Sequence, residues 1–237
     1  QDDTSAGHNI VRSIFLECHA EYLADGPEHL RSVGEVAFIA DLAEQSANSG
    51  KTEIAGIVGN ADLGLGRAVE EVLEALDQAG RGRFRGVRYT TAADDHPPLS
   101  MYDNAPMDSS AFLDGLRTVG ELGYTFDAMV YHPQLPLLAA AARACPDTPI
   151  VIDHLGGFLG TGPYKDRRDE ILSFWYDAMA ELAALPNTFL KTGGIGMPMM
   201  GYRWDKQATP ATSEDLAEVW AEPIQRVIEL FGPHRCM

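Results

Sequence analysis

The chain has 237 residues, 45% of them hydrophobic and 22% charged, an ordinary composition for a globular protein with a sizeable core. Asp and Glu outnumber Lys and Arg by 35 to 18, giving a formal net charge of −17. So acidic a surface repels nucleic acid and anionic membranes, and neither is expected as a partner. The polar start has no secretory signal, no apolar run approaches the ~20 residues of a membrane span, and the three cysteines are scattered. We therefore expect a cytoplasmic protein.

Apolar runs of strand length alternate along the chain with segments of helical period. The predicted strands lie at 10–18, 54–59, 84–89, 125–131, 149–153 and 188–191. The predicted helices lie at about 31–47, 69–80, 110–122, 137–144, 167–184 and 213–230. Gly80 is expected to cap the second helix at its C-terminus, and Ser213 to cap the last helix at its N-terminus. A long polar loop, 90–108, separates the third strand from the third helix.

Strands that are separated by helices pair in parallel, because the helix makes the return crossing. The strands are short and apolar, as expected when both faces of a sheet are buried. Six such units suit a doubly wound sheet or a (β/α)8 barrel. No linker divides the chain, so we predict a single α/β domain over residues 1–237.

Polar side chains follow the ends of the predicted strands, where parallel α/β folds carry their functional groups. They are Glu17, His19, Asn60, Asp62, Arg88, His132, Gln134, Asp153, His154 and Lys191. One such residue means little, but a succession of them indicates a common site for a small molecule.

His132 and His154 are the foremost candidates for catalysis. His132 precedes Pro133, which ends its strand, so we expect its imidazole to project at the mouth of the site. His154 precedes Gly156 and Gly157, which let the backbone turn close to a ligand. Two histidines at consecutive strand ends can share a metal ion or a substrate.

The other candidates have two interpretations each. Asp153 orients His154 or a neighbouring group, or caps the following loop. Arg88 and Lys191 bind a substrate carboxylate or an oxyanion, or form buried ion pairs with Glu17 or Asp153. Glu17 is a base or only that ion-pair partner.

Four segments resemble the amidohydrolase-related family of the amidohydrolase superfamily, from about His8 to Met237. They are Gly86–Arg88, Tyr131–Leu135, Ile152–Gly157 and Lys191–Met197, among which the HPQ and DH-x-GG motifs are the most specific. The resemblance implies a TIM barrel in which the first strand of this chain is barrel strand two, so that the chain holds strands two to seven and the start of strand eight. The family's H-x-H pair and its eighth-strand aspartate have no counterpart here, which predicts a fragment that lacks both ends of the domain.

The resemblance further implies a hydrolase that acts on a small anionic lactone or a related cyclic ester or amide. His132 and His154 would bind a divalent metal, zinc being expected although dispensable in some relatives, or would bind the substrate carbonyl directly. Arg88, Gln134, Lys191 and Glu17 would bind the substrate. The alternatives are a non-oxidative decarboxylase of an aromatic acid and a catalytically silent barrel fragment. Exposed strands at an unclosed barrel leave a homo-oligomer open.

Overall fold

The structure is a computed structural model that describes residues 7, 9–50, 52–100 and 106–237. His8 and part of the predicted loop 90–108 lie outside the described residues. Within that part of the chain, no helix is long and apolar enough to cross a membrane.

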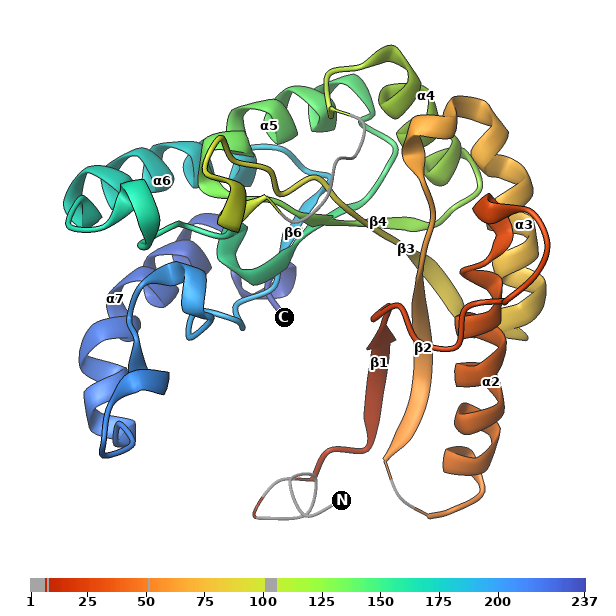
Figure 1. The fold of residues 1–237 in the computed structure, drawn as a ribbon, viewed down its shortest axis with the longest axis horizontal. Helices are drawn as coiled ribbons and strands as arrows, with labels where there is room; N and C mark the ends of the chain where they lie inside the picture. The colour runs from red at the N-terminus through yellow and green to blue at the C-terminus, as the bar shows by residue number, and fades with distance from the viewer. Residues whose placement is uncertain (1–6, 8, 51, 101–105) are drawn as a thin grey trace. The chain divides into compact units, whose positions relative to one another are not determined.

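The six predicted strands and six predicted helices are all present in the described residues, in the predicted order (Figure 1). The strands are β1 (Arg12–Leu16), β2 (Glu53–Asn60), β3 (Phe84–Thr90), β4 (Thr125–Met129), β5 (Ile150–Ile152) and β6 (Thr188–Leu190). The helices are α2 (Val33–Ala47), α3 (Val69–Gly80), α4 (Ser110–Glu121), α5 (Leu135–Ala144), α6 (Arg168–Ala183) and α7 (Ser213–Phe231). The strand order in the sheet follows the chain, and the α/β class is confirmed.

The chain forms two compact units. Unit 1 comprises Gln1–Tyr89 and Ser110–Phe126, and unit 2 comprises Thr90–Ser109 and Asp127–Met237. In unit 1, β1 pairs with β2 and β2 pairs with β3, both in parallel. Helix α2 packs on β2 and α3 (Figure 1). Helix α3 has one apolar face, formed by residues at helical spacing, since Val69, Val72, Leu73 and Leu76 are fully buried.

In unit 2, β5 pairs in parallel with β6, and α6 packs against α5, α7 and β6. A buried apolar cluster lies beneath the loops that follow the strands. Its members are Ala92, Leu99, Met129, Tyr131 and Leu159, with Tyr164, Met197 and Met199 packed against it. This cluster supports the segments that carry the candidate site residues.

Three predicted details are wrong. The left-handed residue that ends α3 is Arg81 (φ 50°), not Gly80, which is still helical. Thr212, not Ser213, caps α7: its hydroxyl accepts a hydrogen bond from the Asp215 backbone N–H, and the Asp215 carboxylate accepts one from the Thr212 N–H. Strand β1 is not buried on both faces, since the Ile14 side chain is 59% exposed.

Candidate functional site

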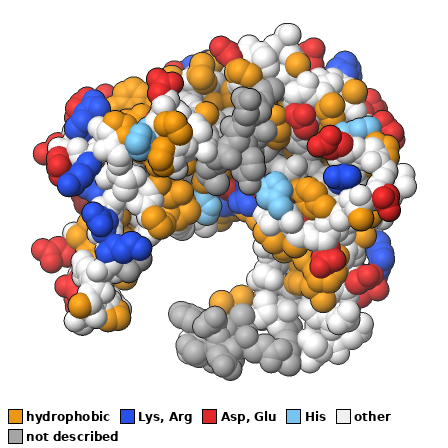
Figure 2. Space-filling model, viewed as in Figure 1, with side chains coloured by type: hydrophobic (Ala, Val, Ile, Leu, Met, Phe, Trp, Pro, Cys, Tyr) orange, Lys and Arg blue, Asp and Glu red, His pale blue; other side chains and the backbone are white. Residues whose placement is uncertain are grey.

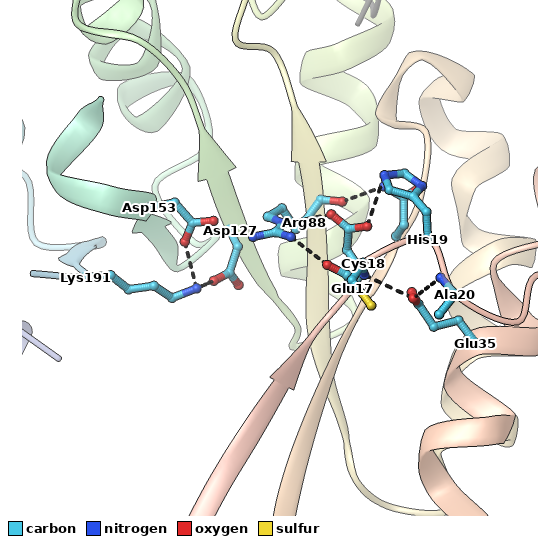
Figure 3. Close-up of polar contacts among 10 residues, drawn as sticks. Glu17, Cys18, His19, Ala20, Glu35, Arg88, Asp127, Asp153 and Lys191 are labelled. Carbon is cyan, nitrogen blue, oxygen red and sulfur yellow. Dashed lines mark hydrogen bonds and ion pairs between the residues drawn. The ribbon is translucent and has the colours of Figure 1, made fainter. Parts of the chain in front are cut away.

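An ion-pair cluster in unit 2 joins strand β4 to the segments that follow β5 and β6 (Figure 3). Lys191, which follows β6, lies between Asp127 of β4 and Asp153, which follows β5. Its Nζ is 2.7 Å from Asp153 Oδ1 and also donates to Asp127 Oδ1. The side chains of Asp127 and Asp153 are 3% and 0% exposed, whereas that of Lys191 is 18% exposed. The cluster therefore presents its cationic member to solvent and keeps its two carboxylates buried.

The loop after β5 has an unusual backbone. His154, Leu155, Gly156 and Gly157 all have positive φ values, of 50°, 58°, 66° and 55°. The two glycines allow the tight turn that the sequence predicted, but a left-handed leucine is strained. The fold holds Leu155 in place: its side chain is fully buried, its N–H donates to Lys191 O (3.1 Å), and its carbonyl accepts from Trp175 Nε1 (2.7 Å).

His154 lies against the glycine-rich segment that follows Lys191. A Cβ atom added to Gly194 would stand only 2.3 Å from His154 Nδ1, so the ring and the glycine backbone are in close contact. In the sequence, this segment is one of the four that resemble the amidohydrolase-related family. Its glycine makes room for the imidazole, and it places His154 and Lys191 on adjoining loops.

His132, whose imidazole we expected at the mouth of the site, is buried at 4% exposure. A 3-10 turn, His132–Gln134, leads directly into α5 and folds the ring inwards. Its Nδ1 accepts a hydrogen bond from the Leu159 N–H (3.2 Å), and the ring meets those of Tyr164 and Phe174 edge to face. Because a backbone N–H can only donate, Nδ1 is unprotonated and the neutral ring carries its proton on Nε2.

Burial lowers the pKa of His132 from 6.5 to about 4; Asp94 opposes this shift and Arg167 adds to it. The imidazole is therefore neutral near pH 7. Tyr164 donates its hydroxyl proton to Asp94 Oδ2 (2.7 Å), and burial together with this bond raises the pKa of Tyr164 to about 12. His132 thus has a buried environment with two aromatic neighbours, and the Asp94 carboxylate lies beyond Tyr164.

Gln134 uses its side chain to hold the backbone. Its Oε1 accepts from the Tyr131 N–H (2.9 Å), and its Nε2 donates to the carbonyls of Thr91 (2.8 Å) and Ala93 (3.0 Å). These bonds tie the loop after β3 to the turn after β4. The predicted contact between Gln134 and a substrate stays a prediction.

Unit 1 contains a second charged group, built on the segment after β1. The Arg88 side chain donates from Nε to Glu17 Oε1 (2.8 Å) and from Nη2 to the Glu17 carbonyl (2.6 Å). The Glu17 side chain is 2% exposed, and its Oε2 lies 3.3 Å from His19 Nε2. This is the ion pair that the sequence left as the alternative role of Arg88.

Glu35 anchors the same segment from helix α2. Its side chain is fully buried, and Oε1 accepts hydrogen bonds from the backbone N–H groups of Cys18 (3.0 Å) and Ala20 (2.7 Å) (Figure 3). Burial and the nearby Glu35 carboxylate raise the pKa of the Cys18 thiol. Glu35 therefore fixes the backbone on both sides of His19.

The described residues do not form a metal site. Among them, no group of three or more His, Cys, Asp or Glu side chains could hold a metal ion. The Nδ1 lone pair of His132 is engaged by Leu159, and in that tautomer Nε2 carries a proton and cannot ligate. The donor set described here therefore does not fit the predicted divalent metal.

The sequence analysis missed Asp127, Glu35 and the pair Asp94–Tyr164. For Asp127 and Glu35 a signal was present: each is the acid of an otherwise apolar stretch, Thr125–Met129 and Val33–Ala40. A lone acid on a buried face needs a partner. Asp94 carried no such signal, because its loop is polar throughout.

Parallel strands in chain order, each followed by a helix, with charged groups at the strand ends, define an α/β protein of the kind that places its active site there. The family to which the chain belongs is that of the amidohydrolases (Amidohydro_2), a family of hydrolases, whose family model matches residues 19–237. The resemblance stated from the sequence is confirmed.

Two relatives that the chain matches are named as lactonases. The chain is 28% identical over 204 residues to an L-fucono-1,5-lactonase of Burkholderia multivorans, covering 86% of this chain and 60% of that protein. It is 31% identical over 162 residues to the enzyme of the same name from Burkholderia ambifaria, covering 68% of this chain and 48% of that protein. The chain thus spans about 60% or less of the length of these relatives.

A solved amidohydrolase from Burkholderia multivorans has a similar structure. The TM-score is 0.60 at 26% identity, over 84% of this chain and 62% of that one. That protein has been crystallised with bound zinc and with bound HEPES.

Proposed function

We propose that the protein is a hydrolase that opens a small anionic lactone or a related cyclic ester or amide. The observation that carries this proposal is the ion-pair cluster of unit 2, in which Lys191 is partly exposed while Asp127 and Asp153 are buried. An ammonium held in this way is preorganised to stabilise negative charge on a substrate oxygen. Membership of the amidohydrolase family and the lactonase relatives support the same reaction.

In the proposed chemistry, the oxygen of water forms a bond to the lactone carbonyl carbon, and negative charge develops on the carbonyl oxygen. When the carbonyl re-forms, the bond to the ring oxygen breaks, and the proton lost by the water passes to that oxygen, so that the product is a hydroxy acid. Lys191 donates a hydrogen bond to the carbonyl oxygen, while Asp153 and Asp127 keep the ammonium charged and in place. His154, on the adjoining loop, polarises the same carbonyl. His132 is neutral and protonated on Nε2, so we assign it a donor role rather than that of a base.

Three further predictions, on substrate-binding residues, a divalent metal and the barrel, stay proposals. Arg88, Glu17 and Gln134 suit substrate binding by chemical type, although each has protein partners here. The zinc bound by the solved relative favours a divalent metal in the whole protein. Because the described donors do not form its site, no step is assigned to it. We also infer that β1–β6 are successive strands of an eight-stranded barrel.

The proposal is tested in the full-length protein by assaying hydrolysis of L-fucono-1,5-lactone and of carboxylated lactones. The release of protons measures the rate of hydrolysis. We expect Lys191→Met, His154→Asn and His132→Ala each to lower kcat/KM by about 10²-fold or more. His29→Asn, which changes a surface histidine of unit 1, should leave it unchanged. Unchanged kcat/KM in the first three variants would overturn the assignment. Release of carbon dioxide from an aromatic acid, without lactone hydrolysis, would select the decarboxylase.

A further inference from the structure

A pocket of about 480 Å³ in unit 2 has a composition opposite to that of the chain. It lies between the start of α6 and the segment before α7, where Figure 2 shows Lys and Arg side chains gathered. Among the residues that the structure describes, four cations line it, namely Lys165, Arg168, Arg203 and Lys206, and one acid, Asp166. In a chain with nearly twice as many acids as bases, such a concentration of positive charge calls for an explanation.

The guanidinium of Arg168 is fixed before any ligand arrives. Its Nη2 donates to the Met200 carbonyl (3.0 Å), and its Cζ lies 4.2 Å from the centre of the Tyr202 ring. Tyr202 in turn stacks on Trp204, with an angle of 14° between the rings. A guanidinium held in this way loses little side-chain entropy on binding an anion.

Close backbone contact brings the two walls of the pocket together. A Cβ atom on Gly160 would lie 2.3 Å from the Met200 carbonyl oxygen, and one on Gly201 would lie 2.2 Å from that of Gly160. The Gly160 N–H donates to Met199 O (2.8 Å). The pocket is therefore a built feature of the fold, which only glycine allows at these two positions.

Three of the four cations that line the pocket differ from their neighbour Arg167 in their ion pairing. Lys165, Arg168 and Arg203 form no ion pair within 4.0 Å among the acids that the structure describes. By contrast, the neighbouring Arg167, which does not line the pocket, makes two hydrogen bonds to Glu170. Arg168 is also the first residue of α6, whose N-terminus adds partial positive charge.

We propose that this pocket binds a small polyanion through its carboxylate or phosphate groups. Bidentate hydrogen bonding from arginine suits both kinds of oxyanion. The pocket adjoins the candidate site, because Tyr164 lines it and its ring lies 5.1 Å from that of His132. Lactone opening releases a hydroxy acid, so the product would carry the group that this pocket takes. The assignment of this product as a ligand rests on the proposed function, whereas the proposal that the pocket binds an anion does not.

Calorimetric titration of the full-length protein with citrate, and separately with inorganic phosphate, tests the proposal without measuring turnover. We expect saturable binding of at least one probe at one site per chain. The double variant Lys165→Gln/Arg203→Gln should weaken that binding at least about tenfold, since it removes two charge-assisted contacts. The matched control is Arg167→Gln, which removes one nearby charge outside the pocket and should change the affinity less than about twofold. Thermal melting verifies that the variants are folded.

Three results would overturn the proposal: no saturable binding of either probe, equal binding by the double variant, or an equal loss in Arg167→Gln. Binding of citrate alone would identify the ligand class as carboxylates, and binding of phosphate alone as phosphates. Failure of the lactone assay with intact anion binding would reject the proposed function only. The reverse pattern would reject this inference only.

Discussion

The charge of Lys191 is balanced by two carboxylates that are distant from it in the sequence. Neither Asp127 nor Asp153 can be hydrated where it lies, since their side chains are 3% and 0% exposed. The ammonium therefore stabilises both carboxylates, and removing it takes the cation away from two buried negative charges. The stability of unit 2 and its proposed chemistry rest on the same side chain.

Replacing Lys191 by methionine should lower the free energy of unfolding by about 3–5 kcal/mol at pH 7, because it removes the partner of buried charges. Urea denaturation measures this loss. The matched control is Arg143→Met, which breaks the exposed ion pair with Glu181 and should cost about 1 kcal/mol or less. Equal losses in the two variants would show that the cluster is hydrated like a surface pair.

His132 should make stability depend on pH in a known direction. Its pKa falls from 6.5 in the unfolded chain to about 4 in the fold, so between these values the unfolded state binds more protons. The free energy of unfolding is therefore highest above pH 6.5 and falls as the pH decreases towards 4. The total decrease due to His132 is roughly 3 kcal/mol at most.

Urea unfolding at pH 4.5, 5.5 and 7 measures this dependence. His132→Gln should flatten it, while His29→Gln, at a surface histidine, should leave it unchanged. A pH dependence that is the same in wild type and His132→Gln would contradict the buried, neutral imidazole.

At the scale of elements, the loops after β5 and β6 constrain each other. The left-handed run from His154 to Gly157 is held by the Lys191 carbonyl, and the His154 ring fits only against a glycine at position 194. The two loops therefore depend on each other, and we expect a change in either loop to displace His154.

Gly194→Ala should displace the His154 ring, because the new Cβ would meet Nδ1 at 2.3 Å and because the φ of +87° disfavours any L side chain. We expect a loss of about 1–3 kcal/mol in stability and at least a tenfold lower kcat/KM for lactones. Gly193→Ala is the matched control, since its added Cβ has no atom within 4 Å. If both variants kept wild-type activity, the position of His154 would be irrelevant to turnover.

At the scale of the whole molecule, the net charge of −17 is the dominant physical property. Repulsion among the excess acids opposes the compact state, and salt screens it. The pocket at the start of α6 is a local exception to this field.

We expect the melting temperature to rise by several degrees between 0.02 and 0.5 M salt, values at which the Debye length falls from roughly 20 Å to about 4 Å. Differential scanning calorimetry in sodium chloride and in choline chloride measures this and separates screening from specific ion binding. A melting temperature independent of both salts would show that the charges are already balanced locally.

The order and kind of the elements, and the strand-end position of most candidate residues, could be predicted from the amino-acid sequence. Local signals sufficed because hydrophobic periodicity and strand length are properties of short segments, as the apolar face of α3 illustrates. Motifs such as HPQ and DH-x-GG also sufficed to identify the family, because they are contiguous.

The contacts among those residues could be known only once the chain is folded. The fold paired Lys191 with Asp127 as well as Asp153, buried His132 against Leu159, and gathered four cations from two distant segments into one pocket. Which residues form ion pairs and which are buried depends on which loops meet in space. Burial in turn lowers the local dielectric constant. A residue's neighbours in the sequence carry neither piece of information.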